Sequence, residues 1–233
     1  MSNRTLLLLF DVDGTLVDSA GSGSRSVRKA VEALHGDASV FDRVQFAGRT
    51  DMVIVSDALR LLGVEPLPER LEEVRLLYLA KLASELEAAG DRAKALPGVT
   101  DLLARLHVDP CFQTGILTGN WSDGARMKLS HCGIWHFFPF GAFGEDGPER
   151  ERLVGPALER AGAWSGRSFR HEEVWVIGDT PLDVRCGIEN GTRTLAVATG
   201  PYTRSQLERA GADIVIDAID TATDLEAMLL DFH

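Results

Sequence analysis

The sequence contains few cysteines, and none of them is arranged as in a metal site or a disulfide framework. Cys111, Cys132 and Cys186 are odd in number, far apart, and outside any CxxC or Cys/His motif, which argues against the usual zinc spacings. Isolated cysteines of this kind are typical of reduced core residues. We therefore expect a cytoplasmic protein and assign no nucleophilic role to a cysteine.

Long apolar runs and positive charge are also scarce. No apolar stretch approaches the ~20 residues that span a bilayer, and the short run near the N-terminus leads into aspartates, which indicates a strand rather than a signal peptide. Lys and Arg number 24 against 35 Asp and Glu, a net charge of −11. This balance argues against a nucleic-acid partner, and a phosphate substrate would need local cations. We expect neither a membrane nor a nucleic acid as partner.

The most informative stretch is residues 5–19, TLLLLFDVDGTLVDS. Its apolar run from Leu6 to Phe10 predicts a strand buried on both faces, as in the middle of a parallel sheet. Asp11 and Asp13 follow at once, and buried carboxylates are costly unless a cation or hydrogen bonds compensate them. The pattern favours a site with a metal between the two carboxylates. The alternative is a strand followed by an ordinary Asp-Gly turn.

The rest of the chain has two parts. Residues 20–90 show helical apolar stripes, which predict either a helical insert or ordinary core helices. From about residue 95, strands and helices alternate, which predicts βαβ units and a parallel sheet. The expected helices are 27–34 (stopping at Gly36), 51–62, 69–89, 99–106, one from an N-cap at Ser122, one ending near 163, 181–190 and 203–210. The expected strands are 111–120, 138–143, 172–180, 194–199 and 213–217.

Three predicted strands end in polar residues of a consistent kind. The first ends in Asp11 and Asp13, the second in Thr118, and a later one in Asp179, with Asp183 one helical turn further on. In open parallel sheets, ligands bind at the carboxyl ends of the strands. We therefore expect these side chains to converge on one edge of the sheet.

The motifs DVDGT, LTGN and GDTPLD, in this order and spacing, resemble those of the haloacid dehalogenase-like hydrolase superfamily, in particular its phosphoglycolate-phosphatase-like branch. The resemblance implies an α/β fold: a three-layer, Rossmann-like parallel-sheet core, residues 1–16 and 92–233, with a helical cap inserted at 17–91. It also implies a Mg²⁺-dependent phosphatase acting on a small phosphorylated metabolite, as a monomer or homodimer.

The resemblance implies roles for four aspartates. Asp11 would attack phosphorus and form an aspartyl-phosphate. Asp13 would act as general acid and then general base, and its backbone carbonyl would bind Mg²⁺. The carboxylates of Asp11 and Asp179 would be metal ligands. Asp183 would be a further ligand or, as we favour, a partner of the ligands. The dehalogenases of this superfamily lack an acid at the position of Asp13, so its presence favours phosphoryl transfer.

The resemblance also implies a phosphate-binding set. Thr118 and the backbone N–H groups of Gly119 and Asn120 would bind the phosphoryl oxygens, and Gly14 would let the backbone approach them. Arg49, in the polar loop 46–51, would project from the cap and bind a second anionic group, unless it is an exposed surface residue. Trp121 would either line the pocket or cover the start of a helix.

The sequence departs from the family pattern at one motif. The family normally carries a lysine before the helix that follows the third strand, and here the region reads EDGPERERL. Arg150 is the first candidate to replace the lysine and Arg152 the second, because arginine keeps the charge and binds phosphate in a bidentate way. The alternative is that both are solvated and the cation is missing. Two other functions therefore stay open: a phosphomutase of the same fold, and a non-catalytic binding or regulatory relative.

Overall fold

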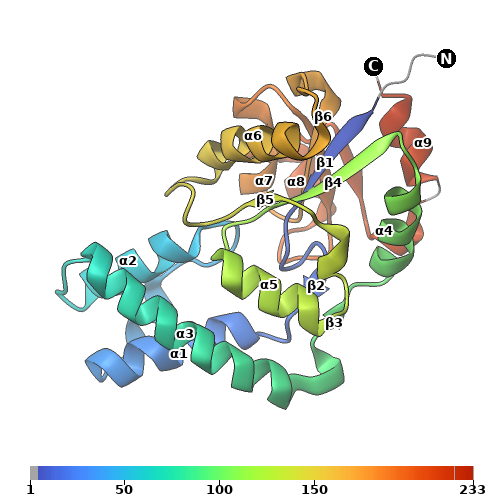
Figure 1. Ribbon diagram of the computed structural model, residues 1–233. Coiled ribbons are helices and arrows are strands. Elements are labelled where there is room, and N and C mark those ends of the chain that lie inside the picture. Colours follow the sequence, from blue (N-terminus) through green and yellow to red (C-terminus); the bar gives the residue numbers. More distant parts are fainter. Residues whose placement is uncertain (1–4, 223, 233) are drawn as a thin grey trace.

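The computed structural model describes residues 5–222 and 224–232, so residues 1–4, 223 and 233 of the predicted core lie outside it. Figure 1 shows a sheet covered by helices, with a helical cap at one side. The main sheet has the strand order β5-β4-β1-β6-β7-β8, and all its pairs are parallel. These strands are β1 (Leu6–Phe10), β4 (Phe112–Leu117), β5 (Gly141–Ala142), β6 (Val174–Gly178), β7 (Arg193–Val197) and β8 (Ile214–Ile216). The expected α/β fold with a parallel sheet is confirmed.

Strand β1 lies at the centre of the sheet because all five of its side chains are apolar. It pairs with β4 on one side and β6 on the other, and every residue from Leu6 to Phe10 is buried. Successive side chains of a strand point to opposite faces. Leu6, Leu8 and Phe10 therefore pack in one core cluster, and Leu7 and Leu9 pack in another.

Helices cover both faces of the sheet and complete three layers. One face packs against α4, α5 and α9, and the other packs against α6 and α7, with α8 beyond them. Their bounds are α4 (Val99–Val108), α5 (Ser122–His131), α6 (Val154–Ser165), α7 (Pro181–Glu189), α8 (Arg204–Ala210) and α9 (Leu225–Leu230). Within the described residues, no helix combines the length and apolarity needed to cross a bilayer.

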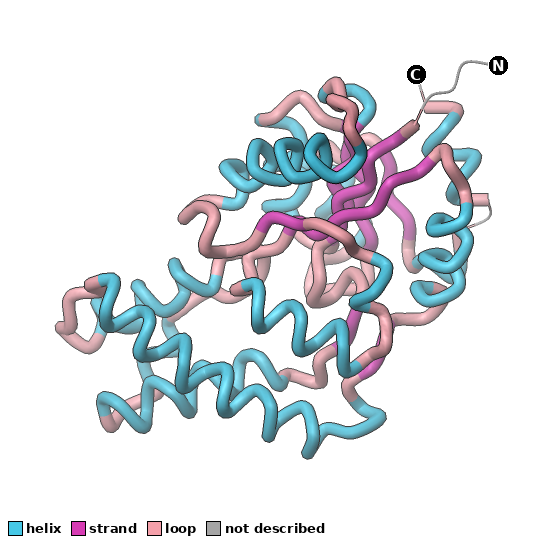
Figure 2. Tube along the Cα trace, viewed as in Figure 1, coloured by secondary structure: helices cyan, strands magenta, loops and turns pink. Residues whose placement is uncertain are grey.

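The cap consists of α1 (Ser22–His35), α2 (Asp51–Leu61) and α3 (Pro68–Ala89). Their apolar stripes form a core cluster of their own, which Trp121 of the sheet domain joins. Helix α1 ends at Gly36, which adopts the left-handed conformation expected of a glycine stop. Two short strands, β2 (Val17–Asp18) and β3 (Lys94–Ala95), pair antiparallel where the chain enters and leaves the cap (Figure 2). The pair lies near the predicted boundaries at 17 and 91, which remain a prediction.

The structure corrects some predicted elements. The strand predicted at 138–143 shortens to β5, because Pro139 has no N–H to donate and a 3-10 turn occupies Trp135–Phe137. Ser122 is the first residue of α5 and not its N-cap, which is Trp121. Strands β2 and β3 and helix α9 were not predicted, since segments of two to six residues carry too little periodicity.

Candidate active site

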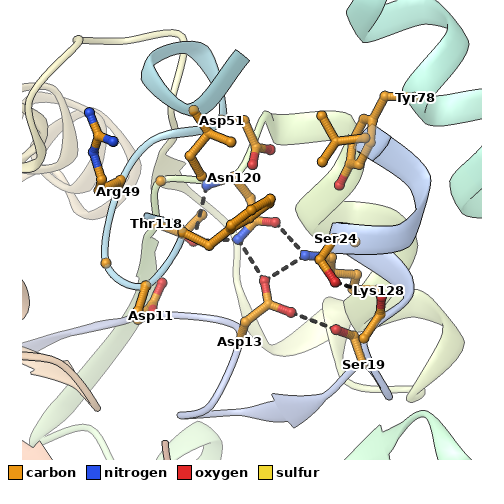
Figure 3. A pocket seen from close by; sticks show the side chains of 18 of the residues that line it. Asp11, Asp13, Ser19, Ser24, Arg49, Asp51, Tyr78, Thr118, Asn120 and Lys128 are labelled. Atoms are coloured by element: carbon orange, nitrogen blue, oxygen red, sulfur yellow. Dashed lines mark hydrogen bonds and ion pairs between the residues drawn. The ribbon is translucent and has the colours of Figure 1, made fainter. Parts of the chain in front are cut away.

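The carboxyl ends of β1 and β4 meet the cap at a cavity of about 230 Å³ (Figure 3). The parallel register brings these strand ends to one edge of the sheet, as the polar strand exits predicted. Seven of the predicted site residues line the cavity: Asp11, Asp13, Arg49, Thr118, Gly119, Asn120 and Arg150. The structure therefore brings together residues that lie up to 139 positions apart in the chain (11 to 150).

Three buried carboxylates form a cluster beside this cavity. Asp11, Asp179 and Asp183 each offer an oxygen within 4.8 Å of the others. Burial raises the pKa of Asp179 above its ordinary value, and the nearby carboxylates of Asp11 and Asp183 raise it further. Such a cluster is unfavourable in its ionised form unless a cation lies close to it.

The cluster fits a hard divalent cation. Oδ1 of Asp183 is buried, and the guanidinium of Arg150 lies beside it, with Nη2 2.7 Å away. A carboxylate oxygen carries two lone pairs, so this oxygen can face a cation as well as the arginine. Its Oδ2 accepts hydrogen bonds from the backbone N–H (3.0 Å) and hydroxyl (2.7 Å) of Thr180. This capping box at the start of α7 fixes the orientation of the Asp183 side chain. Carboxylate oxygens are the ligands that Mg²⁺ prefers.

Gly14 lies against Asp179. Its φ is +79°, and a Cβ at this position would lie 2.5 Å from Asp179 Oδ2. The hydroxyl of Thr15 donates to the other oxygen of Asp179 over 3.3 Å. The glycine is thus required for a close approach of the backbone to a carboxylate of the cluster, and its predicted contact with phosphate stays a prediction.

Arg150 lies next to Asp11, whereas Arg152 lies at the surface. Nη2 of Arg150 is 2.7 Å from Oδ1 of Asp11 and 2.7 Å from Oδ1 of Asp183, and the side chain is only 4% exposed. The side chain of Arg152 is 69% exposed and pairs with Glu149. Burial raises the pKa of Asp11, and the guanidinium of Arg150 partly offsets this rise. Of the two candidate arginines, the fold brings Arg150 to the first aspartate.

Both carboxylate oxygens of Asp13 are held by donors. Oδ1 accepts from the hydroxyl of Ser19 (2.9 Å), and Oδ2 accepts from the amide of Asn120 (2.9 Å) and the ammonium of Lys128 (2.5 Å). The Asn120 amide also donates to the hydroxyl of Thr118. Burial alone would raise the pKa of Asp13, but these donors outweigh it and hold the pKa below its ordinary value.

The loop 46–51 of the cap closes the cavity by docking on the sheet domain. The backbone N–H of Asp51 donates to the carbonyl of Gly119 over 2.7 Å, and the hydroxyl of Thr50 donates to the carbonyl of Pro148 over 3.1 Å. A Cβ at Gly119 would lie 2.3 Å from the carbonyl oxygen of Arg49. The loop and the strand exit are therefore in backbone contact.

Arg49 lines the cavity, but its guanidinium is engaged in the cap. It forms an ion pair with Asp57 at 2.7 Å, and in Figure 3 its side chain points away from Asp11 and Asp13. Trp121 is buried against Tyr78, with ring centroids 5.4 Å apart, so of the two predicted positions for Trp121 the structure shows packing over the helix start.

Sequence analysis missed two ionisable residues of the cavity, Lys128 and Asp51. Lys128 lies on the buried stripe of α5, between Ala125 and Leu129, and a lysine on an apolar helical stripe was an available signal. Asp51 accepts a hydrogen bond from the backbone N–H of Trp121 over 2.9 Å. Burial raises its pKa to about 6, although Lys128 acts in the opposite direction. No pattern distinguished Asp51 from other acids in the first turn of a helix.

Comparison with known proteins identifies the class. The model of the haloacid dehalogenase-like hydrolase family matches residues 8–197. The chain is 25% identical over 211 residues to a phosphoglycolate phosphatase of Pectobacterium atrosepticum, covering 90% of this chain and 87% of that protein. It is also 25% identical to the probable phosphatase IndB of Dickeya dadantii, covering 96% and 94%.

Solved structures share the fold. A mutant of CbbY from Rhodobacter sphaeroides, in complex with xylulose 1,5-bisphosphate, superposes with a TM-score of 0.72 at 20% identity, covering 94% of this chain and 96% of that one. A hydrolase from Pseudomonas syringae gives 0.67 at 23% identity, covering 93% and 95%. The chain belongs to the haloacid dehalogenase-like hydrolase family. It is a phosphatase of that family, a phosphoric monoester hydrolase, as the resemblance implied.

Proposed function

We propose that this protein hydrolyses a small phosphate monoester in two steps, through an aspartyl-phosphate on Asp11, with Mg²⁺ as cofactor. The placement of Asp11 carries the proposal. Its carboxylate lines a small cavity, lies within 4.8 Å of two further buried carboxylates and forms an ion pair with a buried arginine. A nucleophile of this kind needs cations on both sides, because it must approach an anionic phosphate.

The first step forms a bond between Asp11 and phosphorus and breaks the bond to the leaving oxygen. Thr118, Gly119 and Asn120 line the same cavity and bind the phosphoryl oxygens. Asp13 gives a proton to the leaving oxygen. Because the pKa of Asp13 is lowered in the substrate-free protein, this proton comes from the bound phosphate monoanion, whose second pKa is about 6.

The second step returns the enzyme to its starting state. Asp13, now ionised again, takes a proton from a water molecule while the water oxygen attacks phosphorus and Asp11 leaves. Asp13 then passes this proton to the product phosphate, which leaves its carboxylate ionised as at the start. Arg150 stays beside Asp11 in both steps and balances the charge that the nucleophile carries before and after it is phosphorylated. Arg150 thus takes the place of the family lysine, although its charge comes from a planar guanidinium.

Asp11, Asp179 and the backbone carbonyl of Asp13 would hold the magnesium ion, and Asp183 would bind it directly or orient these ligands. When bound, Mg²⁺ neutralises charge on the phosphoryl oxygens and on the carboxylate cluster. The raised pKa of Asp179 and the close approach of the three buried carboxylates support this assignment.

We infer that the substrate is a small phosphorylated metabolite. A cavity of about 230 Å³ suits a compact molecule, and phosphoglycolate is the first compound to test, since curated relatives are named for it. A phosphomutase of the same fold would transfer the phosphoryl group to a second substrate hydroxyl and release little phosphate. A non-catalytic relative is disfavoured, because Arg150 supplies a cation beside Asp11. We further propose a cytoplasmic monomer or homodimer.

Phosphate release from a panel of small esters, with Mg²⁺ and with EDTA, tests this function. We expect Asp11→Asn to lower kcat/KM by at least about 10³-fold, as removal of a nucleophile does, and EDTA to abolish turnover reversibly. Asp101→Asn, an exposed change on α4, is the matched control and should have no effect. Near-normal rates for Asp11→Asn would show that the nucleophile is wrongly assigned.

A further inference from the structure

A buried lysine faces the acid–base residue from the sheet domain. The side chain of Lys128 is 4% exposed, and its ammonium lies 2.5 Å from Oδ2 of Asp13 and 2.6 Å from Oδ1 of Asn120. Lysine is almost never fully buried unless it is paired. Lys128 is distinct from Arg150, the candidate for the motif lysine, because Arg150 pairs with Asp11 and Asp183.

Lys128 belongs to a network that leaves the Asp13 carboxylate little freedom to rotate. Asn120 accepts from Lys128 and donates both to Asp13 and to Thr118. Ser19 holds the opposite oxygen of Asp13. Figure 3 shows these side chains converging on Asp13 from the segment after β2, the exit of β4 and helix α5. A carboxylate held at both oxygens has its orientation fixed.

The cap packs against the ammonium of Lys128 at Gly23, a residue without a side chain. A Cβ at Gly23, on α1, would lie 3.0 Å from Nζ of Lys128 and 3.9 Å from the hydroxyl of Tyr78. Tyr78 comes from α3, so two cap helices surround the tip of the lysine. Any side chain at position 23 would press on the ammonium. The pocket that Lys128 fills is therefore formed jointly by the cap and the sheet domain.

We propose that Lys128 is a positioning residue, which holds the carboxyl group of Asp13 in the orientation that serves the leaving oxygen. This inference rests on the proposed function. In the first step the P–O bond to the leaving group breaks while Asp13 gives that oxygen its proton. In the second step Asp13 takes a proton from the attacking water. Lys128 exchanges no proton in either step and acts through the direction in which it holds Asp13.

Esters with different leaving groups distinguish positioning of Asp13 by Lys128 from a role of Lys128 in the stability of the fold. An alkoxide leaving group needs a proton as the P–O bond breaks, whereas p-nitrophenolate leaves with little help. Loss of a well-placed general acid costs about 10²–10⁴-fold, and the loss should fall on alkyl esters. The value of kcat/KM covers the chemistry only up to transfer of the phosphoryl group to Asp11, so the later water step does not affect it.

The experiment measures kcat/KM of the wild type and its variants for two substrates, both with Mg²⁺. One substrate is an alkyl phosphate that the wild type hydrolyses, and the other is p-nitrophenyl phosphate. We expect Lys128→Met to lower the alkyl value by about 100-fold and the aryl value much less. Lys128→Arg should recover part of the alkyl activity. Lys128→Met combined with Asp13→Asn should be no worse on the alkyl ester than Asp13→Asn alone. Arg126→Met, an exposed cation change on the same helix, is the control and should leave both values unchanged.

Gly23→Ala gives a second test if Lys128→Met does not fold. It displaces the ammonium without removing it and should show the same preference for loss on the alkyl ester, with smaller size. An equal loss on both esters, or a loss confined to esters that carry a second anionic group, would overturn the inference. A wild type without phosphatase activity, or an active Asp11→Asn, would instead overturn the proposed function, so the two failures are distinct.

Discussion

Arg150 is the cation that the structure places beside Asp11, where we propose that it acts in place of the family lysine. Its guanidinium is buried, lies between two carboxylates and donates to the carbonyl of Leu117 over 3.2 Å. Its two Nη atoms donate to the backbone carbonyls of Gly48 and Leu117, and a planar guanidinium with several donors suits this arrangement better than the single ammonium of a lysine. If Arg150 takes the role of the lysine that is missing from EDGPERERL, as we propose, its position depends on the 3-10 turn Arg150–Leu153 that precedes α6.

Arg150→Ala should lower kcat/KM by about 10²–10³-fold, comparable with removal of a donor at a transition-state oxyanion. It should also destabilise the fold by about 3–5 kcal/mol, because buried carboxylates lose their cation. Steady-state kinetics and urea unfolding measure the two effects. Arg152→Ala is the control, and an effect of similar size there would move the role to Arg152.

Asp51 gives a prediction about pH. Its pKa is raised from 3.8 to about 6 by burial, so the folded state binds a proton more tightly than the unfolded state. The stabilisation is complete below pH 3.8 and is lost as the pH rises towards 6. Asp51→Asn keeps an acceptor for the Trp121 N–H and cannot lose a proton. Urea unfolding in EDTA should therefore show the variant gaining stability relative to wild type between pH 4 and pH 6. A constant difference would contradict the burial of Asp51.

The residues that the sequence identified are those attached to strand ends. Asp11, Thr118 and Asp179 follow apolar runs directly, and the geometry of a parallel sheet brings such positions together. Lys128 and Asp51 could not be found in this way, because Lys128 reaches Asp13 from the middle of α5 and the placement of Asp51 depends on how the cap docks on the sheet. Arg49 was expected either to bind a second anionic group or to be an exposed surface residue, and the sequence could not reveal that Asp57 pairs with it.

At the scale of elements, the contact that closes the cavity is the one between the cap loop 46–51 and the exit of β4. Backbone atoms of the two segments are in contact at Gly119, and the Asp51 N–H donates to its carbonyl. The sequence predicted the polar loop and both flanking helices. It could not predict the contact, since no periodicity records which loop of an inserted unit meets which strand.

Gly119→Ala should push the cap loop 46–51 away from the exit of β4. Its Cβ would lie 2.3 Å from the carbonyl oxygen of Arg49, a backbone atom that cannot move by a rotamer change. We expect kcat/KM to fall at least tenfold, since a shift of about 1 Å in a positioning segment can cost about 10²-fold. Gly155→Ala, on α6 with open space around it, is the control and should keep full activity. Full activity of Gly119→Ala would show that cap docking does not matter for turnover.

At the scale of the whole molecule, a chain with a net charge of −11 gathers three of its carboxylates, all buried, at one sheet edge. Arg150 supplies one positive charge there, which leaves the cluster short of cations. The alternation of strands and helices sufficed to predict the parallel sheet, and the three motifs sufficed to predict the family. The boundaries of the cap rest on two-residue strands, which carry no pattern of their own.

Mg²⁺ should therefore stabilise the folded protein. A ligand at 100 times its Kd adds about 2.7 kcal/mol, which for a chain of this size raises Tm by roughly 5–10 °C. Asp179→Asn should raise Tm in EDTA, because it relieves repulsion within the cluster, and should remove most of the Mg²⁺ effect. Thermal unfolding measures both. An undiminished Mg²⁺ shift in Asp179→Asn would place the ion elsewhere.

The covalent step is tested most directly by mass spectrometry of the acid-quenched enzyme during a single turnover. The wild type, mixed with a phosphate ester that it hydrolyses and with Mg²⁺, should carry one phosphoryl group on the peptide that contains Asp11. Asp11→Asn should carry none under the same conditions. A phosphoryl group on another residue, or turnover by the wild type with no phosphorylated peptide at any time, would contradict the role of Asp11.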